Sequence, residues 1–598
     1  MLLGKYVNKF YLKYGIFFLI GVAALVAVDY LQLFIPEYLG EVVNLLHVPA
    51  GEQINIEAIS KIVLYVVFVA IGMFVGRIIW RVAVFHASTN IQASLRHQMF
   101  LKAERLSLDY YHQNKVGTIT AWFTNDIDEV EDFFGWGTIM LVDALFMSAL
   151  VIVKMFLLDL PLTLIALIPM LLIVVWGALV EKFMSQRWEN RQKAFDNLYD
   201  FSQENFTGIR VIKAFVKQTQ ELHAFAKVAR KSKDANLSFA RLSVIFDNCI
   251  AIIISAILAI LVGFGGWFVY ASQTGNPVTL FGHEVTLNAG QLVTFLGYFE
   301  TLIWPMMALG QIVSMRSRAK TSLKRISHFL DEEENVKDKE GAIELKDVKG
   351  NITFNHFSFV YPDSGKLYLK DISLEIKAGE KIGIVGKIGS GKTTLANSLL
   401  RSYNVEPNNV LIDGHDIMDV TLYSLRKNIA YVPQDNFLFS DTIKNNIAFS
   451  DEEDESDRYI SAAKFSDVHS DISDFTNSYE TVSGERGVTL SGGQKQRISI
   501  ARAFYTGAPI LILDDSVSAV DVKTEETILH NIQTQREGKT TILVASRVST
   551  VAHMDRIIVL NDGCLEAFDT PENLLKISST YKNMVKLQKL EEEVEGGR

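Results

Sequence analysis

Six long apolar stretches in the first half of the chain limit what it can fold into. A helix needs about 20 apolar residues, at about 1.5 Å rise each, to cross the hydrocarbon of a bilayer. The qualifying segments are centred near Ala24, Ala70, Phe146, Leu171, Ala256 and Tyr298. The rest of the 598-residue chain lacks such runs, and this length exceeds what one core supports. The sequence therefore predicts a helical membrane domain with six transmembrane helices and a separate soluble domain.

The distribution of Lys and Arg predicts which loops are cytoplasmic. Loops rich in these residues stay on the inner side of the membrane. The basic segments are 86–132, 181–247 and the N-terminus, whereas residues 37–60 and 272–287 contain neither Lys nor Arg. We therefore expect both termini in the cytoplasm. The short outer loops favour a bacterial plasma membrane. The mixture of lysines with Leu, Tyr and Phe before the first span suits an interfacial helix, with a frayed terminus as the alternative.

Several ionisable residues lie within or beside the predicted spans. They are Asp29, Arg77, Arg81, Asp143, Lys154 and Glu300. Charges are costly in lipid, so these side chains should face one another, a cavity or the bundle interior. We expect most of them to form ion pairs; the alternative is that the acids contact a cationic substrate.

The last predicted span contains the best candidates for a substrate cavity. Glu300 lies close to the run WPMM, in which Pro305 can kink the helix. Trp304, Met306 and Met307 offer an adaptable apolar surface beside it. We therefore predict that Glu300 and these three side chains line the cavity.

The second half contains a glycine-rich motif that binds nucleotide phosphates. Short β-branched strands alternate there with helical runs, which is typical of an α/β domain. The strand KIGIVG runs into GKIGSGKTT, which matches the pattern GxxxxGK[ST]. Lys392 can neutralise the outer phosphates and the Thr393 hydroxyl can bind Mg²⁺, while backbone N–H groups wrap the phosphates. The predicted cradle comprises Gly386, Gly389, Ser390, Gly391, Lys392, Thr393 and Thr394.

Two further motifs supply a second Mg²⁺ anchor and a second phosphate site. The apolar run ILILD ends at Asp514, a position suited to a carboxylate that holds Mg²⁺. The run LSGGQ opens a helix that Ser491 can cap, and helix N-termini bind phosphate. The residues of this second site are Ser491, Gly492, Gly493 and Gln494.

These motifs, in this order and behind six spans, resemble those of half-transporters of the ATP-binding cassette (ABC) exporter family, which have a type IV fold. The resemblance covers almost the whole chain and implies ATP as the nucleotide. It implies that Tyr361 stacks on adenine, that Gln434 senses Mg²⁺ and the attacking water, and that Asp521 links two nucleotide sites. Asp514 would then hold Mg²⁺ through water.

The resemblance also implies contacts between the two domains. The run GERG that ends at Gly487 is similar to the family's segment that contacts the membrane domain. Gly117 and Gly208 fall in regions similar to the two coupling helices, and each is expected to mark a turn at the tip of a helical hairpin. We expect a membrane domain over residues 1–325, a charged linker over 326–345, a nucleotide-binding domain over 346–590 and an acidic tail over 591–598.

The chain departs from the family at two positions of the hydrolytic centre. The family usually has a glutamate and a histidine where this chain has Asp515 and Ser546. Aspartate withdraws its carboxylate by roughly 1 Å, a displacement that can cost on the order of 100-fold in rate. Serine cannot stabilise transition-state charge as an imidazole would. We therefore expect this chain's site to bind ATP and to hydrolyse it slowly or not at all.

The unaltered LSGGQ run can still complete a hydrolytic site on a partner that keeps the glutamate and histidine. The sequence thus predicts a heterodimer, similar to bacterial multidrug exporters, that moves amphipathic drugs or lipids outward by alternating access. A homodimeric lipid flippase and a nucleotide-gated regulator or channel are the alternatives, because fold alone does not determine substrate. The formal charge of −10 and the lack of a basic arm argue against nucleic acid as a partner.

Overall fold

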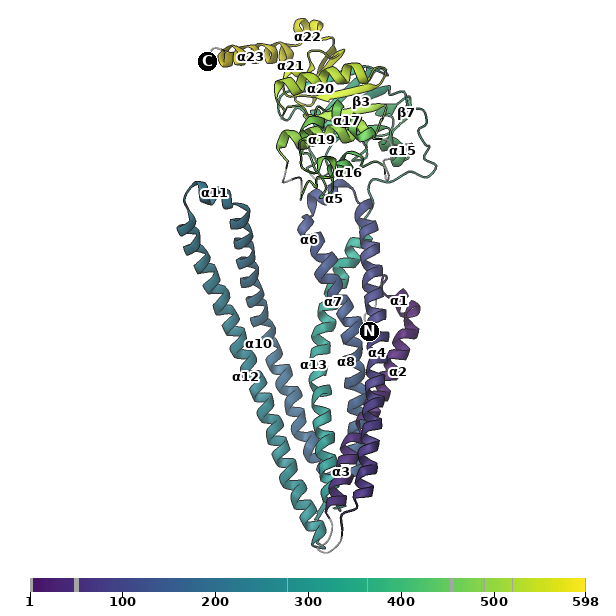
Figure 1. Cartoon of the computed structure of the whole chain (residues 1–598), viewed down its shortest axis with the longest axis vertical. Helices are drawn as coiled ribbons and strands as arrows, with labels where there is room; N and C mark the ends of the chain where they lie inside the picture. The colour runs from purple at the N-terminus through teal and green to yellow at the C-terminus, as the bar shows by residue number, and fades with distance from the viewer. Residues whose placement is uncertain are drawn as a thin grey trace. The chain divides into compact units, whose positions relative to one another are not determined.

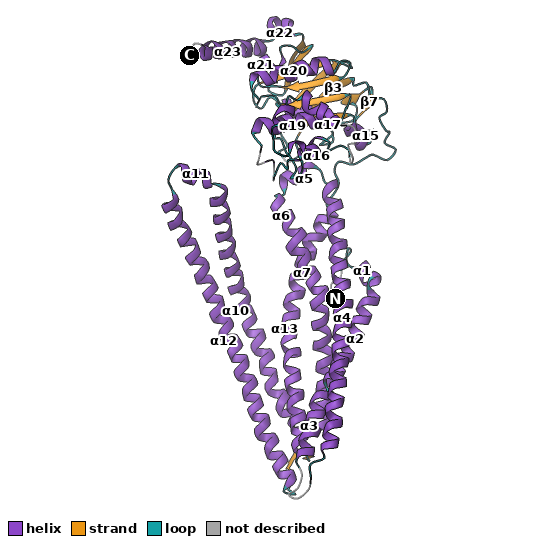
Figure 2. Ribbon diagram, viewed as in Figure 1, coloured by secondary structure: helices purple, strands orange, loops and turns teal. Residues whose placement is uncertain are grey.

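The computed structural model divides the chain into two compact units. Unit 1 comprises Met1–Phe100 and Ile119–Asp331, and unit 2 comprises Leu101–Thr118 and Glu332–Arg598. Unit 1 is almost entirely helical, whereas unit 2 contains the two larger sheets (Figures 1 and 2). The structure describes residues 4–47, 53–276, 278–362, 364–451, 457–484, 487, 490–518 and 520–596.

Unit 1 is built from long helices because a helix satisfies its own backbone hydrogen bonds, which lipid cannot do. Its helices are α1 (Asn8–Lys13), α2 (Gly15–Gln32), α3 (Phe34–Leu46), α4 (Ile56–Arg105), α6 (Val116–Ala121), α7 (Ile127–Asp132), α8 (Thr138–Val142), α9 (Ser148–Leu158), α10 (Leu160–Thr207), α11 (Ile209–Ala214), α12 (Gln218–Gln273) and α13 (Ala289–Asp331). Three π-helical segments, η1 (Trp122–Asp126), η2 (Phe133–Gly137) and η3 (Asp143–Met147), interrupt the third span. A hairpin of β1 (Val278–Leu280) and β2 (His283–Val285) precedes α13.

Five of the six predicted spans fall on helices long and apolar enough to cross a membrane. These are Gly15–Leu46, Ile56–Arg105, Val116–Leu158, Gln218–Gln273 and Ala289–Asp331. The sixth, predicted near Leu171, falls on α10, whose described apolar part is Leu160–Met170. The side chain of Leu171 itself lies outside the described residues.

Close backbone contact joins α3 to α13. A Cβ atom on Gly40 would lie 2.4 Å from the Gly290 carbonyl oxygen, and one on Gly290 would lie 2.1 Å from the Gly40 oxygen. The Gly290 amide donates to Asn44 Oδ1 at 2.9 Å. Small residues thus allow these two helices to pack, as in other membrane bundles.

The expected ion pairs within the spans form only in part. Lys154 Nζ lies 2.7 Å from Glu37 Oε1, so this lysine pairs with a carboxylate that the sequence reasoning had not considered. The Tyr298 hydroxyl donates to the same Glu37 oxygen at 2.5 Å. The Glu37 carboxylate is half-buried, and it therefore compensates the charge of Lys154, which would otherwise lie among apolar side chains.

The prediction of ion pairing was wrong for Asp29 and Asp143. Among the described residues, neither carboxyl group forms an ion pair with Arg77 or Arg81. The physical reason is orientation: both arginines are exposed on α4, whereas Asp29 is buried and Asp143 is half-buried.

Two other local expectations differ from the structure. Gly117 is the second residue of α6, and the chain breaks instead near Asn114, whose backbone is extended. Gly208 does end α10, as expected.

Helix α13 continues to Asp331, into the range predicted as linker, because Ile326 and Phe329 extend its buried face.

Unit 2 contains a mainly parallel six-stranded sheet in the order β12-β11-β5-β10-β9-β8 and an antiparallel four-stranded sheet in the order β4-β3-β6-β7. The first sheet consists of β5 (Lys381–Gly386), β8 (Ile429–Val432), β9 (Ile510–Asp514), β10 (Thr540–Val544), β11 (Arg556–Asn561) and β12 (Cys564–Asp569). The second consists of β3 (Ile352–Val360), β4 (Leu367–Ile376), β6 (Val410–Ile412) and β7 (His415–Asp416).

The helices of unit 2 contribute to the cores on both faces of the parallel sheet. They are α5 (Leu108–Gln113), α14 (Lys392–Ser398), α15 (Leu422–Lys427), α16 (Ile443–Ile447), α17 (Arg458–Phe465), α18 (His469–Ser473), α19 (Gly492–Tyr505), α20 (Val522–Gln535), α21 (Val548–Val551), α22 (Pro571–Ile577) and α23 (Ser579–Gly596). α23 thus reaches into the predicted acidic tail.

The period of two in β9 explains why this strand is apolar throughout. Ile510 and Ile512 face the core between the two sheets, whereas Leu511 and Leu513 pack in the core on the opposite face. A strand covered on both faces reads as a continuous apolar run. The carboxylate at its end, Asp514, therefore has a defined position at the sheet edge.

One buried cation stabilises the junction of β9, α20 and β10. Arg536 is 1% exposed; its Nη2 donates to the carbonyl oxygens of Ala508 at 3.1 Å and Thr540 at 3.3 Å. Its Nε donates to Thr541 Oγ1 at 3.1 Å. Burial lowers the pKa of Arg536 to about 10, so the guanidinium stays charged at neutral pH.

We predict that Arg536→Leu lowers the free energy of unfolding of unit 2 by about 2–4 kcal/mol, because the substitution leaves buried carbonyl groups without donors. Calorimetry of the full chain measures this as a lower transition temperature. Lys523→Leu, at an exposed position of α20, is the matched control and should change stability by less than about 0.5 kcal/mol. Equal effects of the two substitutions would contradict the assignment.

Candidate nucleotide-binding site

The glycine-rich loop joins β5 to α14 at the carboxyl edge of the parallel sheet. Gly389 and Gly391 have φ angles of +80° and +96°, which glycine adopts without strain. A Cβ atom on Gly386 would lie 2.3 Å from the Leu560 carbonyl oxygen, and one on Gly391 would lie 2.5 Å from Leu369 Cδ2. Backbone conformation therefore favours glycine at position 389, and at position 391 both conformation and space require it.

Two side chains of the loop have polar atoms available for an anion. Lys392 Nζ donates to the carbonyl oxygens of Gly386 at 2.9 Å and Lys387 at 3.2 Å, which holds the ammonium over the loop. Burial lowers the pKa of Lys392. Ser390 is 2% exposed and its hydroxyl has no hydrogen-bond partner among the described residues. An orphaned hydroxyl beside a lysine at a helix N-terminus fits a bound phosphate.

Thr393 and Asp514 meet at the position expected for Mg²⁺. The Thr393 hydroxyl donates to Asp514 Oδ1 at 3.1 Å. The Thr393 hydroxyl could bind Mg²⁺ directly while Asp514 holds one of the ion's water ligands, since Mg²⁺ usually keeps several waters. Burial raises the pKa of Asp514, and the cationic charge of Mg²⁺ would favour its ionised form. The residues present therefore fit a hydrated Mg²⁺ ion.

Sequence reasoning missed Tyr431 as a member of this site. Its hydroxyl donates to Asp514 Oδ2 at 3.2 Å and so fixes the orientation of the carboxylate. Tyr431 begins the run YVPQD, in which the sequence predicts only Gln434 as a site residue. Gln434 lies exposed in the loop after β8. The sequence feature that could have indicated Tyr431 is its position near the end of β8, which pairs with the strand that ends at Asp514.

Asp515 and Ser546 lie side by side after β9 and β10. Ser546 Oγ is 3.5 Å from Asp515 Oδ2, at the limit of a hydrogen bond. Asp515 Oδ1 has no partner among the described residues. The Asp515 backbone has φ +47° and its amide donates to the Val544 oxygen at 3.0 Å. The backbone is thus fixed, and both side chains are short.

The LSGGQ run forms a complete capping box at the start of α19. Ser491 Oγ accepts from the Gln494 amide at 3.2 Å, and the Ser491 amide donates to Gln494 Oε1 at 3.0 Å. Gly492 is exposed with open space around its Cβ position, and Gly493 follows it in the first turn. The N-terminus of α19 is therefore accessible to an anion.

A charged pair that the sequence did not reveal supports this helix start. Asp471 Oδ2 accepts from Arg497 Nη2 at 2.6 Å and from Gln494 Nε2 at 3.2 Å. α18 and α19 are thereby joined by polar contacts. The sequence does not reveal this ion pair, because Asp471 lies far from the LSGGQ run and Arg497 lies after it.

Two further predicted nucleotide contacts, Tyr361 and Asp521, belong to unit 2. Part of the GERG run, which is predicted to contact the membrane domain, lies outside the described residues. The Tyr361 hydroxyl lies 3.0 Å from Thr394 Oγ1, and its ring packs edge-on against Tyr368 and Tyr403. Asp521 caps α20 by accepting from the Thr524 amide at 3.1 Å, and these hydrogen bonds lower its pKa. Within the GERG run, Glu485 and Arg486 lie outside the described residues.

Residues 101–118 belong to the same compact unit as the nucleotide site. α5 carries His112, whose Nδ1 lies 3.1 Å from the Tyr403 hydroxyl. Lys102 Nζ lies 3.0 Å from Glu334 Oε1 in a mostly buried ion pair. Residues 101–118 therefore pack with unit 2, although we had assigned them to the membrane domain.

The predicted cavity residues of α13 are largely accessible. Glu300 is exposed, while Trp304 and Met307 are 50% and 37% exposed. Met306 packs partly against the apolar core of unit 1. The Trp304 side chain lies near the half-buried carboxyl group of Asp143.

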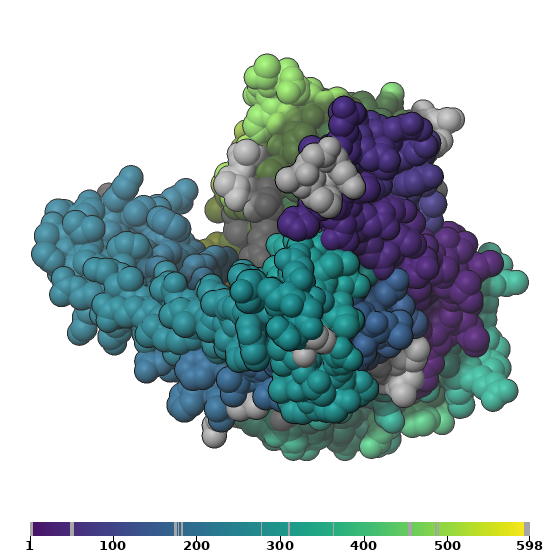
Figure 3. Space-filling view, turned by 90° about the horizontal axis from the view of Figure 1, so that it is seen from below, coloured from purple at the N-terminus to yellow at the C-terminus, as the bar shows by residue number. Residues whose placement is uncertain are grey.

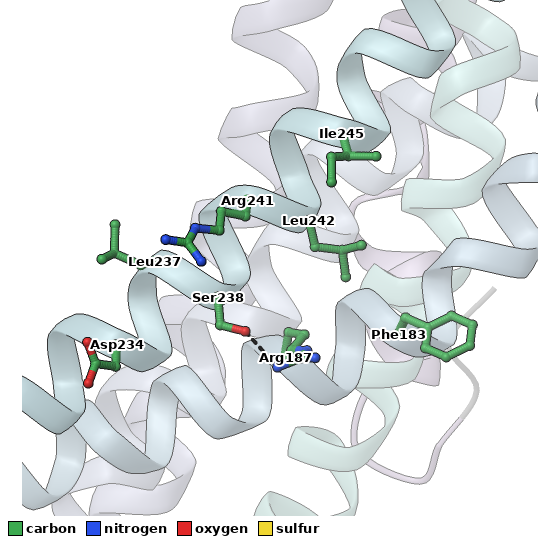
Figure 4. Close-up of a pocket in the computed structure, with 8 residues that line it drawn as sticks. All are labelled: Phe183, Arg187, Asp234, Leu237, Ser238, Arg241, Leu242 and Ile245. Atoms are coloured by element: carbon green, nitrogen blue, oxygen red, sulfur yellow. Dashed lines mark hydrogen bonds between the residues drawn. The ribbon is translucent and has the colours of Figure 1, made fainter.

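The helical pair α10 and α12 stands to one side of the other helices of unit 1 (Figures 1 and 3). A cleft of about 520 Å³ lies between these two helices, where Arg187 Nη1 donates to Ser238 Oγ at 2.6 Å (Figure 4). Phe195, Tyr199 and Phe206 are exposed along α10. Exposed aromatic side chains of this kind are typical of an interaction surface.

Comparisons with known proteins match both units. Residues 18–306 match the family model described as "ABC transporter transmembrane region", and residues 369–518 match the model described as "ABC transporter". The structure resembles that of a bacterial Atm1-family ABC exporter with ATP bound, with a TM-score of 0.76 and 25% identity. The match covers 97% of this chain and 99% of that one.

Curated bacterial proteins are similar over nearly the whole length. The probable multidrug resistance ABC transporter protein YheI of Bacillus subtilis is 34% identical, with 99% of each chain covered. The multidrug resistance-like protein MdlA of Escherichia coli is also 34% identical, over 96% of this chain and 94% of its own. The chain therefore belongs to the ATP-binding cassette transporters, as an ATP-hydrolysing member with the type IV exporter fold.

Proposed function

We propose that this chain is the degenerate-site subunit of a heterodimeric exporter that moves amphipathic drugs or lipids out of the cytoplasm or inner leaflet. Its phosphate loop binds ATP with Mg²⁺, and its LSGGQ run completes the hydrolytic site of the partner. Both termini lie in the cytoplasm and the spans lie in a bacterial plasma membrane. The multidrug names of the two similar bacterial proteins support the substrate class.

The pair Asp515 and Ser546 is the observation that carries this proposal. Asp515 is anchored through its amide to β10, so its short carboxylate cannot advance by moving the backbone. Ser546 offers a neutral hydroxyl at 3.5 Å. A site of this kind lacks both a well-placed base for water and a cationic group for developing charge.

The binding parts, by contrast, are all present. The unpaired Ser390 hydroxyl, the ammonium of Lys392 and the oxygen pair of Thr393 and Asp514 suit phosphate and Mg²⁺. The capping box at Ser491 presents the N-terminus of α19 for a second nucleotide. A site that binds ATP but hydrolyses it slowly is expected in a subunit whose partner carries the hydrolytic site.

The exposed helical pair α10–α12 supports assembly with a second half-transporter. Its cytoplasmic aromatic side chains would contact water in a single chain, and burial of such area stabilises association. Any second half-transporter with a complementary surface could use it. The choice between a second copy and a different chain therefore rests on the hydrolytic centre.

We predict that Asp514→Asn lowers the affinity for ATP in the presence of Mg²⁺ by about 10–100-fold, because the neutral amide loses the charge that anchors the ion. Affinity for ATP in the presence of a chelator should stay unchanged. Fluorescent nucleotide binding with and without Mg²⁺ measures the difference. An equal loss in both conditions would indicate a structural defect and contradict the metal role.

We predict that Asp515→Glu combined with Ser546→His raises ATP hydrolysis at this site by about 10–100-fold, since the base advances and an imidazole becomes available. The measurement uses the purified complex, with the partner's own hydrolytic site inactivated. Asp515→Asn combined with Ser546→His is the matched control, which adds the imidazole without a base. A wild-type site as fast as the double variant would show that Asp515 already works as a base.

A further inference from the structure

Two carboxyl groups lie on neighbouring elements inside the membrane-spanning part of unit 1. Asp29 lies in α2 and Asp143 is the first residue of the π-helical segment η3, and these two elements pack together. The two groups are close enough to interact electrostatically. π-helical turns are rare and occur often at functional sites.

Asp29 is the more deeply buried of the two. It is 4% exposed, and its Oδ2 atom has no hydrogen-bond partner among the described residues. Asp143 Oδ1 is likewise without a partner there. A buried carboxyl group with an unused oxygen costs free energy, so a pair of them needs a compensating ligand or proton.

The surrounding charges do not supply that compensation. On α4, Arg77 and Arg81 are exposed, and the Arg81 guanidinium lies 5.4 Å from the Trp80 ring. On α9, Lys154 is paired with Glu37 of α3. On α13, Glu300 is exposed and acidic. No ion pair joins any of these groups to the two aspartates in the described part of the chain.

The immediate surroundings are apolar and aromatic. Val28 and Val142, the neighbours of the two acids in sequence, belong to one buried cluster with Trp80. Trp304 of α13 lies near Asp143 and is 50% exposed. This indole therefore joins the acid to an accessible surface, and aromatic faces attract organic cations.

We propose that Asp29 and Asp143 form a binding site for the positive charge of an amphipathic organic cation. Two carboxylates are too few for Ca²⁺ or Mg²⁺, which need six or more oxygen ligands, and the described residues contain no group of three potential metal ligands. The apolar cluster suits the hydrophobic body of such a compound. The inference rests on the proposed export function and specifies one substrate class for it. Protons compete with the cation for the same two groups.

Equilibrium binding of radiolabelled tetraphenylphosphonium to the full chain in lipid nanodiscs tests the site, with neutral triphenylphosphine oxide as the comparison ligand. Asp29→Asn and Asp143→Asn should each weaken tetraphenylphosphonium binding by about tenfold or more and leave the neutral ligand unaffected. Wild-type cation binding should fall as the pH is lowered, because protons neutralise the two carboxylates, whereas the double Asn variant should show no such fall.

Two sets of variants control for structure. Glu284→Gln removes a carboxylate from the exposed hairpin of β1 and β2 and should leave cation binding unchanged. Asp29→Glu and Asp143→Glu keep the charge and should retain most of the binding. Unchanged tetraphenylphosphonium binding in both Asn variants, or an equal loss of the neutral ligand, would overturn the site.

The assay separates this inference from the export function, because it contains neither ATP nor a partner. Cation binding that depends on both aspartates in a chain that exports nothing would support the site and contradict the function. Export of an amphipathic compound together with undiminished cation binding by the Asn variants would contradict the site alone.

Discussion

The parallel pairing of β5, β10 and β9 is the constraint on which the nucleotide site depends. Val544 aligns with Ile384 on one side and with Asp514 on the other. The loops that follow these strands therefore emerge at one edge, as in other open α/β sheets. One edge consequently carries the phosphate loop, the acidic pair and Ser546. Both faces of β9 must be buried for this order to persist, which accounts for its continuous apolar sequence.

At this edge, the residues suited to binding Mg²⁺ and phosphate are distinct from the residue at the position of the hydrolytic base. Thr393, Tyr431 and Asp514 form a hydrogen-bonded set that needs no further side chain to orient the metal carboxylate. Asp515 is held by its backbone, while its side chain has little support. A change of one methylene at that position therefore alters the chemistry without disturbing the phosphate loop. This independence is consistent with a chain that retains ATP but leaves hydrolysis to a partner.

Much of the architecture could be predicted from the sequence because its signals are local. Apolar length determines a span, and glycines with a lysine at fixed spacing determine a phosphate loop. The sequence could not predict in the same way whether a charged side chain within a span faces the inside of the bundle or its outer surface. Arg77 and Asp29 each lie on a helix whose apolar residues surround it, so periodicity did not reveal which side faces inward.

Long-range contacts were also beyond sequence reasoning. Tyr431 and Asp471 contribute to the nucleotide sites through partners distant in the chain. Residues 101–118 join unit 2 although a continuous helix, α4, leads into them. In each case the decisive contact follows from tertiary packing, which a pattern within one segment does not encode.

ATP hydrolysis by the purified full chain, alone and after co-expression with a second half-transporter that carries the glutamate and histidine, tests the central claim most directly. The account predicts little turnover by this chain alone and rapid turnover by the pair, which disappears when the partner's glutamate is replaced by glutamine. Rapid hydrolysis by this chain alone would show that Asp515 is a competent base and would contradict the heterodimeric assignment.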